Sequence, residues 1–437
     1  MQRVINYKLI KNNLPFSFLS IILIVILIYS FFYPIPTESG VDYGVGVGSK
    51  LLNIGDRFFY HRSNTDMCEY KSVLITCDEY YGQIKPGPLY PFLIKIISKF
   101  LNFFGINNTS KIWNFFLISI TTFLTFASLY FIEKSAYVLS RTSEAKYASW
   151  LFVFCPYTYF FAINGGLTMY MIFGVSLSTY LIINFNFGSK IHYKNTFLIK
   201  SASICISGIY LSLLRPTGTI FSLIIILVAI FILLRKIFNH SEKKLLLISL
   251  IFFISSFIFL LSQFSYYSSY IDHSLTEFNK EYGNFFGVDR TIIREALSKD
   301  YNQISDTLKQ YVYLIIWKIN DFIAGLLDIR GTHTLFTNNS LPPLFPFLMR
   351  VSTGLFYLIP VNMLFVFGII YFRKIVLSSG LWIVSLASLI SISPSIMGYS
   401  NSRFLIMFYP PFLIIAGLML SVILSEKGSK KLHNFQE

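Results

Sequence analysis

The sequence has few charged residues. Asp, Glu, Lys and Arg make up 13% of its 437 residues, 54% are hydrophobic, and the mean hydropathy is +0.60. In soluble domains about 25% of residues are charged. A chain with so little charge cannot cover the surface of a soluble domain, and we therefore predict an integral membrane protein.

Acidic residues are scarcer than basic ones. The chain has 21 Asp and Glu against 36 Lys and Arg, which gives a net charge of +15 and a pI near 9.4. The basic residues stand in short clusters between apolar runs, a distribution typical of topology signals. We therefore expect membrane lipids as partners and no nucleic acid.

Metal-binding patterns are also missing. The sequence has no CxxC motif and no His or Cys spacing typical of a metal site. The adjacent Asp78 and Glu79 could offer oxygen ligands to a divalent cation, but no recognisable cage surrounds them. No metal site and no cofactor is predicted.

The chain contains four cysteines. Cys68 and Cys77 share a polar stretch, and on an oxidising face of the membrane they could form a disulfide that stabilises a small loop by about 2 kcal/mol. Cys155 and Cys205 lie in apolar runs, and we interpret them as packing residues.

Apolar runs of about 20 residues, the length that a bilayer requires, are frequent. None has Asp or Glu in its central part, which argues against a proton-driven transporter or pump. These runs predict about ten transmembrane helices in an all-α polytopic fold. They cover residues 14–33, 111–133, 145–163, 165–185, 197–214, 216–235, 244–263, 346–371, 376–396 and 402–424.

The run at 88–104 differs from the others. Lys95 and Lys99 recur within it and prolines open it, so we predict an interfacial or re-entrant helix. With both termini in the cytoplasm, the inner segments are basic, as the positive-inside rule requires. The acids of those inner segments are then Glu133, Glu144, Glu242, Glu426 and Glu437.

This topology leaves two large outer regions, 34–110 and 264–345, on a single membrane domain of residues 1–437. We predict interfacial helices in both regions. The first would form a catalytic loop and the second a lid over the site. A composition low in charge and rich in Ile, Phe, Lys and Asn suggests a bacterial inner membrane.

Several polar residues near the outer surface are candidates for chemistry. Asp42 follows the first span and could act as a general base, although its position alone favours a solvated loop aspartate or a helix cap. Arg215 in LLRPTG and Arg403 before the last span could bind a lipid phosphate or extend to headgroups. Lys85 is a further phosphate candidate. The secondary candidates are Asp78, Glu79, Tyr90 and His333.

Three segments resemble the GT-C superfamily of membrane glycosyltransferases, the polyprenyl-phosphate-sugar-dependent kind that includes protein mannosyltransferases and aminoarabinose transferases. They are Asp42 followed by KPGPLYP at 85–91, LLRPTG at 213–218, and RFLIMFYPPFLIIAG from Arg403. Their order along the chain matches the family's. Many relatives have Glu after the segment matching FCPYTYFFAINGG, whereas this chain has Thr168 and Met169 near that place.

The resemblance implies a GT-C-like fold and an inverting transfer of a sugar on the outer face of the membrane. The donor would be a polyprenyl-phosphate-linked sugar, and the acceptor a lipid, a glycan or a protein. Asp42 would be the base. Arg215 and Arg403, with Lys85, would bind the lipid phosphate.

Two other functions remain open. The first is a surface-polysaccharide polymerase or ligase that uses a lipid-diphosphate donor, for which Arg290, Arg294 and Arg330 in the second outer region would be relevant. The second is a non-enzymatic flippase for lipid-linked sugars, which would need a polar path through the membrane.

Overall fold

The computed structural model describes residues 14–32, 67–70, 73–76, 89–106, 111–141, 145–163, 166–187, 194–239, 243–281, 353–397 and 406–424. In chain order the elements are α2 (Leu14–Phe32), β1 (Met67–Tyr70), β2 (Val73–Thr76), α5 (Leu89–Phe103), α6 (Lys111–Ser140), α7 (Lys146–Phe154), α8 (Pro156–Ile163), α9 (Leu167–Phe187), α10 (Lys194–Leu214), α11 (Pro216–Asn239), α12 (Lys243–Glu281), η2 (Gly354–Leu358), α16 (Ile359–Tyr371), α17 (Arg373–Ser379), α18 (Leu381–Met397) and α20 (Pro410–Leu424).

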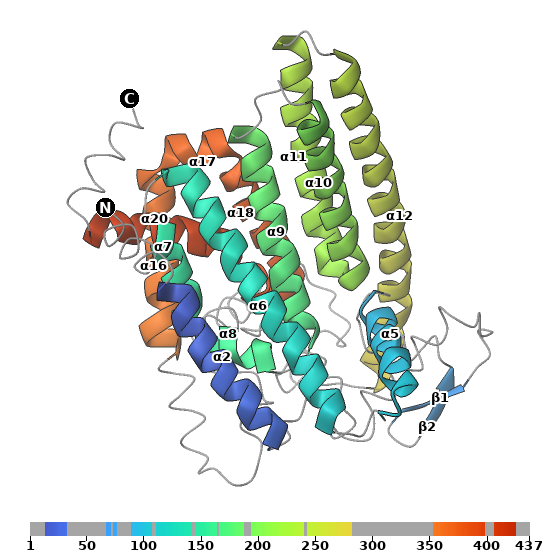
Figure 1. Cartoon of the computed structure of the whole chain (residues 1–437). Coiled ribbons are helices and arrows are strands. Elements are labelled where there is room, and N and C mark those ends of the chain that lie inside the picture. Colours follow the sequence, from blue (N-terminus) through green and yellow to red (C-terminus); the bar gives the residue numbers. More distant parts are fainter. Residues whose placement is uncertain are drawn as a thin grey trace, which may run out of the picture.

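Long helices packed side by side form the body of the molecule (Figure 1). Within the described residues, seven helices are long and apolar enough to cross a membrane, or eight if the bent pair α17 and α18 forms one span. Helices α9 to α12 run alternately down and up the bundle, and each packs on the next. The predicted all-α polytopic membrane architecture is confirmed.

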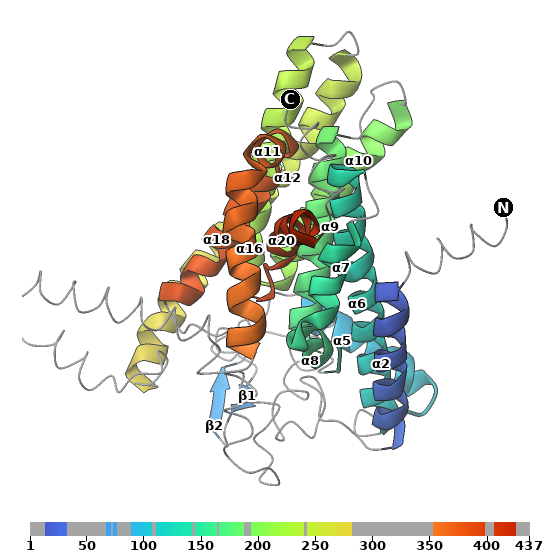
Figure 2. The same ribbon diagram turned by 90° about the vertical axis from the view of Figure 1, so that its left-hand side faces the viewer.

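Three predicted spans take other shapes. The 145–163 run is divided at Cys155 into the short helices α7 and α8, because Pro156 cannot continue the helical hydrogen bonds. The 376–396 run bends by 81° at Gly380, whose φ is +77°. The 402–424 run contributes the 15-residue α20, which lies across the bundle in Figure 1 and is viewed end-on in Figure 2.

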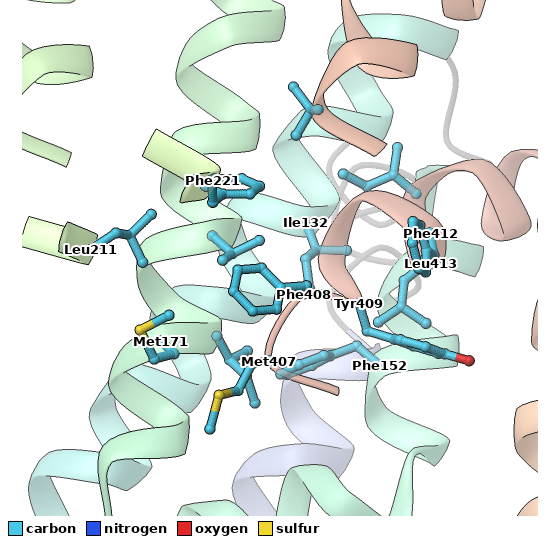
Figure 3. Close-up of a cluster of buried hydrophobic side chains, with 14 of the residues drawn as sticks. Ile132, Phe152, Met171, Leu211, Phe221, Met407, Phe408, Tyr409, Phe412 and Leu413 are labelled. Carbon is cyan, nitrogen blue, oxygen red and sulfur yellow. The ribbon is translucent and has the colours of Figure 1, made fainter. Parts of the chain in front are cut away.

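α20 and the residues just before it are the most deeply buried part of the described chain. Every residue from 406 to 418 is buried. Its neighbours are α16, α7 and α6, and Figure 3 shows Met407, Phe408 and Phe412 among side chains from several other helices. Residues 410–418 of this helix are thus enclosed by protein, and only its last turn, with Ile423 and Leu424, is exposed.

Small residues allow the backbones to approach closely at α20. A Cβ atom on Gly417 would lie 2.5 Å from the Ala148 backbone nitrogen in α7, and one on Gly368 in α16 would lie 2.7 Å from an Ile415 methyl carbon. Membrane helices gain stability from such close packing, since lipid tails offer an equally apolar environment to separated helices.

Inside this apolar bundle, polar side chains form hydrogen bonds with backbone carbonyl groups, both within a helix pair and between helices. At the break between α7 and α8, Thr158 Oγ1 donates to the Phe152 carbonyl (2.7 Å) and Tyr357 Oη donates to the Leu151 carbonyl (2.7 Å). Tyr357 itself lies in the π-helical turn η2. Irregular backbone at membrane depth is tolerated when its groups are paired in this way.

The segments outside the spans partly follow the sequence prediction. α5 has 15 residues and is not among the candidate spans, in keeping with a non-spanning helix at 88–104. α12 has 39 residues, about 58 Å at 1.5 Å per residue. It ends at Glu281, so residues 264–281, the first part of the predicted outer region 264–345, are helical. The antiparallel hairpin of β1 and β2 was not predicted.

We predict that Gly417→Ala lowers the melting temperature of the purified protein by several degrees, because the added methyl group forces α20 away from Ala148. The matched control is Gly208→Ala in α10, where the new Cβ would meet only ordinary contacts at 3.6 Å or more. Both glycines are helical, so both changes gain similar helix propensity. Thermal unfolding in detergent measures the effect, and equal melting temperatures for the two variants would contradict the prediction.

Candidate active site

The LLRPTG segment forms a sharp reversal between two helices. α10 ends at Leu214 and α11 begins at Pro216, so Arg215 is the only residue between them. Proline is well suited to a first helical position. A Cβ atom on Gly218 would collide with the Leu211 carbonyl oxygen, and glycine is therefore required there. The proline and the glycine of this motif thus have a structural role.

Hydrogen bonds tie the two helices together beside this reversal. Gly218 N donates to the Arg215 carbonyl (2.9 Å), and the hydroxyl groups of Ser212 and Thr219 lie 2.9 Å apart. One turn further along, Ser222 Oγ donates to the Gly208 carbonyl (2.8 Å). Arg215 is therefore held on a rigid support between α10 and α11.

Arg215 contacts the segment that follows Arg403. Its Nη1 donates to Met407 Sδ at 3.4 Å, a contact between residues 192 positions apart. Next to it, the rings of Phe221 and Phe408 pack with their centroids 5.7 Å apart (Figure 3). Two of the three segments that carry the GT-C resemblance are therefore in direct contact.

The third of these segments is linked to the same place through tyrosines. Tyr90, in the first turn of α5, is buried and packs edge-on against Tyr170 of α9, with ring centroids 5.5 Å apart. Tyr210 Oη in turn donates to the Tyr170 carbonyl (3.3 Å), one helical turn before Arg215. Tyr90 therefore serves as a packing residue that attaches the end of KPGPLYP to α9 and α10.

A buried hydroxyl lies in the first turn of α11. Thr217 Oγ1 is shielded from solvent and has no hydrogen-bond partner among the described residues. Buried polar atoms are nearly always paired. The described chain has several such unpaired hydroxyls, including those of Ser385 and Ser388, and Thr217 stands two residues after Arg215. Thr217 was not among the predicted site residues, although its position two residues after Arg215, within LLRPTG, was the available signal.

Most of the other predicted site residues lie outside the described residues. These are Asp42, Asp78, Glu79, Lys85, His333 and Arg403, together with Cys77 of the predicted disulfide. Cys68 lies in β1, where it pairs with Ile75. Within the described part of the chain, no three His, Cys, Asp or Glu side chains cluster in a way that could hold a metal ion.

Two further sequence predictions concern residues inside the bundle. Cys155 and Cys205 are buried and free, as predicted for packing residues. Thr168 and Met169, which stand where relatives have an acid, are also buried.

Glu133 was expected at the end of a span, but α6 continues for seven more residues to Ser140. Glu133 accepts a hydrogen bond from Ser149 Oγ (2.9 Å).

No protein-family model matches the chain, and no curated protein sequence matches it. Among solved structures, the chain is similar to the archaeal oligosaccharyltransferase AglB from Archaeoglobus fulgidus, determined in complex with an inhibitory peptide and a dolichol-phosphate. The match covers 98% of this chain and 52% of that one, with 16% identity and a TM-score of 0.49. The chain thus spans about half the length of AglB, and a likeness at this level assigns no function.

Proposed function

We propose that the protein is an inverting glycosyltransferase that moves a sugar from a polyprenyl-phosphate carrier to a lipid, glycan or protein acceptor on the outer face of the membrane. The observation that carries this proposal is the contact between Arg215 and Met407, which joins the LLRPTG segment to the one that begins at Arg403. A guanidinium placed at the junction of two candidate spans suits a lipid phosphate, whose oxygens match its paired donors.

The surroundings of Arg215 favour an anion. α11 begins at Pro216, so the positive end of its helix dipole lies beside the arginine. The Thr217 hydroxyl can donate a hydrogen bond to an oxygen atom that is not part of the described chain. We assign Arg215 and Thr217 to the phosphate of the carrier, together with Arg403 and Lys85.

The proposed reaction needs a base and a charge stabiliser. Asp42 takes the proton of an acceptor hydroxyl, whose oxygen attacks the anomeric carbon of the sugar. The bond from that carbon to the phosphate oxygen breaks on the opposite side, and polyprenyl phosphate leaves with the bonding electron pair. The arginines stabilise the negative charge that develops on the departing phosphate.

The two alternatives differ from this proposal in what the protein binds and releases. A polymerase or ligase would prefer a lipid diphosphate to a monophosphate. A flippase would move the lipid-linked sugar across vesicles without breaking the glycosidic bond. The preference between lipid monophosphate and diphosphate, and the release of polyprenyl phosphate from a lipid-linked sugar, therefore separate the three functions.

We predict that Arg215→Gln weakens the binding of undecaprenyl phosphate by about 10- to 100-fold, because hydrogen bonds to charged groups contribute about 1.5–3 kcal/mol. Binding is measured by native mass spectrometry of the purified protein, with undecaprenyl diphosphate as the competing ligand. Arg141→Gln, at the exposed end of α6, is the matched control and should bind normally. If both variants bind like the wild type, Arg215 is not a phosphate ligand.

We predict that Thr217→Val reduces undecaprenyl phosphate affinity several-fold while leaving the melting temperature nearly unchanged. Valine has the same shape, and the hydroxyl it replaces has no partner in the described protein. The control is Ser222→Ala, which removes a hydroxyl that does bond within the protein and should lower the melting temperature instead. A Thr217→Val protein that loses stability but keeps full affinity would show a purely structural role.

We predict that Asp42→Asn lowers sugar transfer at least about 100-fold, the minimum effect expected on losing a general base. Transfer is measured as release of polyprenyl phosphate from a lipid-linked sugar extract, and undecaprenyl phosphate binding should stay unchanged. Asp78→Asn serves as the control in the same outer region. Full activity of Asp42→Asn would remove the central assignment, whereas a loss confined to Asp78→Asn would move the base to that residue.

A further inference from the structure

We infer that α5 is a membrane-interface helix whose exposed face enters the adjacent lipid leaflet and whose lysines select anionic lipid headgroups. This inference does not rest on the proposed glycosyl transfer. It depends on three sets of side chains on one helix and on the height at which that helix meets the spans.

The first set attaches α5 to the protein. Tyr90, Ile94, Ser98 and Leu101 are buried, with exposures of 3% or less. Their spacing of three and four residues places them on one side of the helix. That side packs against α10, and Tyr90 also contacts Tyr170 of α9. The remaining surface of α5 therefore has a fixed orientation relative to the helix bundle.

The second set is apolar and exposed. Ile96 is 42% exposed, Phe100 53%, Phe103 85% and Phe104 61%. The first three share a side of α5, and Phe104 follows directly after its last residue. The Phe104 ring contacts both the Phe100 ring, with centroids 5.2 Å apart, and the Phe103 ring, with centroids 5.3 Å apart. An exposed aromatic surface of this kind marks a site of contact with a membrane or with another protein.

The third set is basic. Lys95 and Lys99 stand four residues apart, so they form a stripe along the helix. At about 100° per residue, this stripe lies roughly 90° from the exposed apolar side and between it and the buried side. Helices that lie in a membrane interface carry an apolar side in the acyl region and lysines at the level of the headgroups.

The height of this surface identifies the bilayer as its partner. Phe100 packs against Phe116, with ring centroids 6.3 Å apart, and Phe116 is the second residue of the candidate span Phe115–Ser140. Phe115, at the start of the same span, packs against Phe31 near the end of the α2 span at 5.5 Å. The aromatic side of α5 therefore lies where two spans cross the membrane surface.

The first test measures depth. Phe103→Trp and the control Asn102→Trp are introduced singly into the full chain and reconstituted in vesicles of phosphatidylcholine with brominated acyl chains. The signal of the unchanged protein is subtracted to remove its four native tryptophans. We expect the bromines to quench Trp at position 103 at least twofold more than at 102, which aqueous iodide should reach. Iodide quenching of position 103 with none by the bromolipid would overturn the inference and indicate a solvent-facing or protein-binding surface.

The second test measures headgroup selection with the same Phe103→Trp reporter. Brominated phosphatidylglycerol and brominated phosphatidylcholine are compared at equal content in otherwise unlabelled vesicles. We expect at least 1.5-fold stronger quenching by the anionic lipid, and a ratio near one when Lys95→Gln and Lys99→Gln are added. Lys146→Gln, on α7, is the control and should leave the preference intact. Equal quenching by both lipids in the parent protein would overturn the headgroup selection.

Discussion

The packing of the 406–418 segment inside the bundle is the constraint on which the rest of the structure depends. Its residues are buried without interruption, and it contacts helices from both the early and the late parts of the chain. Apolar burial alone cannot hold it there, because a lipid bilayer is as apolar as the protein interior. Close contact between helix backbones provides the additional stabilisation, and Gly417 and Gly368 make that contact possible.

An inserted segment of this kind requires its neighbours to deviate from regular helices. The α7–α8 break and the π-turn η2 occur in or beside the neighbouring helices α7 and α16, and residues 407–409 of the segment itself are non-helical. Tyr409 Oη donates to Asn362 Oδ1 (2.6 Å), and Tyr357 bonds to a carbonyl at the break. Each irregularity would be costly in hydrocarbon if its polar groups were unpaired. The buried tyrosines therefore stabilise the backbone, and they need no catalytic role to explain their position.

The parts of this architecture that could be predicted from the sequence are those governed by local rules. Run length and hydropathy predict the bounds of α9, α10 and α11 to within four residues, and the predicted runs 197–214 and 216–235 leave Arg215 alone between them, as observed. Hydropathy fails for α20, because a helix that is mostly enclosed by protein is as apolar as one that spans lipid. It also gives no information on Met407 as the neighbour of Arg215, since that contact depends on how α20 crosses the bundle.

The position of Arg215 has a consequence for any anionic lipid that binds it. As the only residue between two packed helices, it cannot move far toward a ligand, so the ligand must come to the arginine. α10, which ends just before Arg215, also packs against α5. A lipid carrier keeps its chain in the bilayer and its phosphate at the headgroup level, and under the proposed function lateral diffusion brings that phosphate to Arg215. Under the proposed function, the bundle therefore needs no channel from the aqueous phase for its donor, and only the acceptor has to enter from outside.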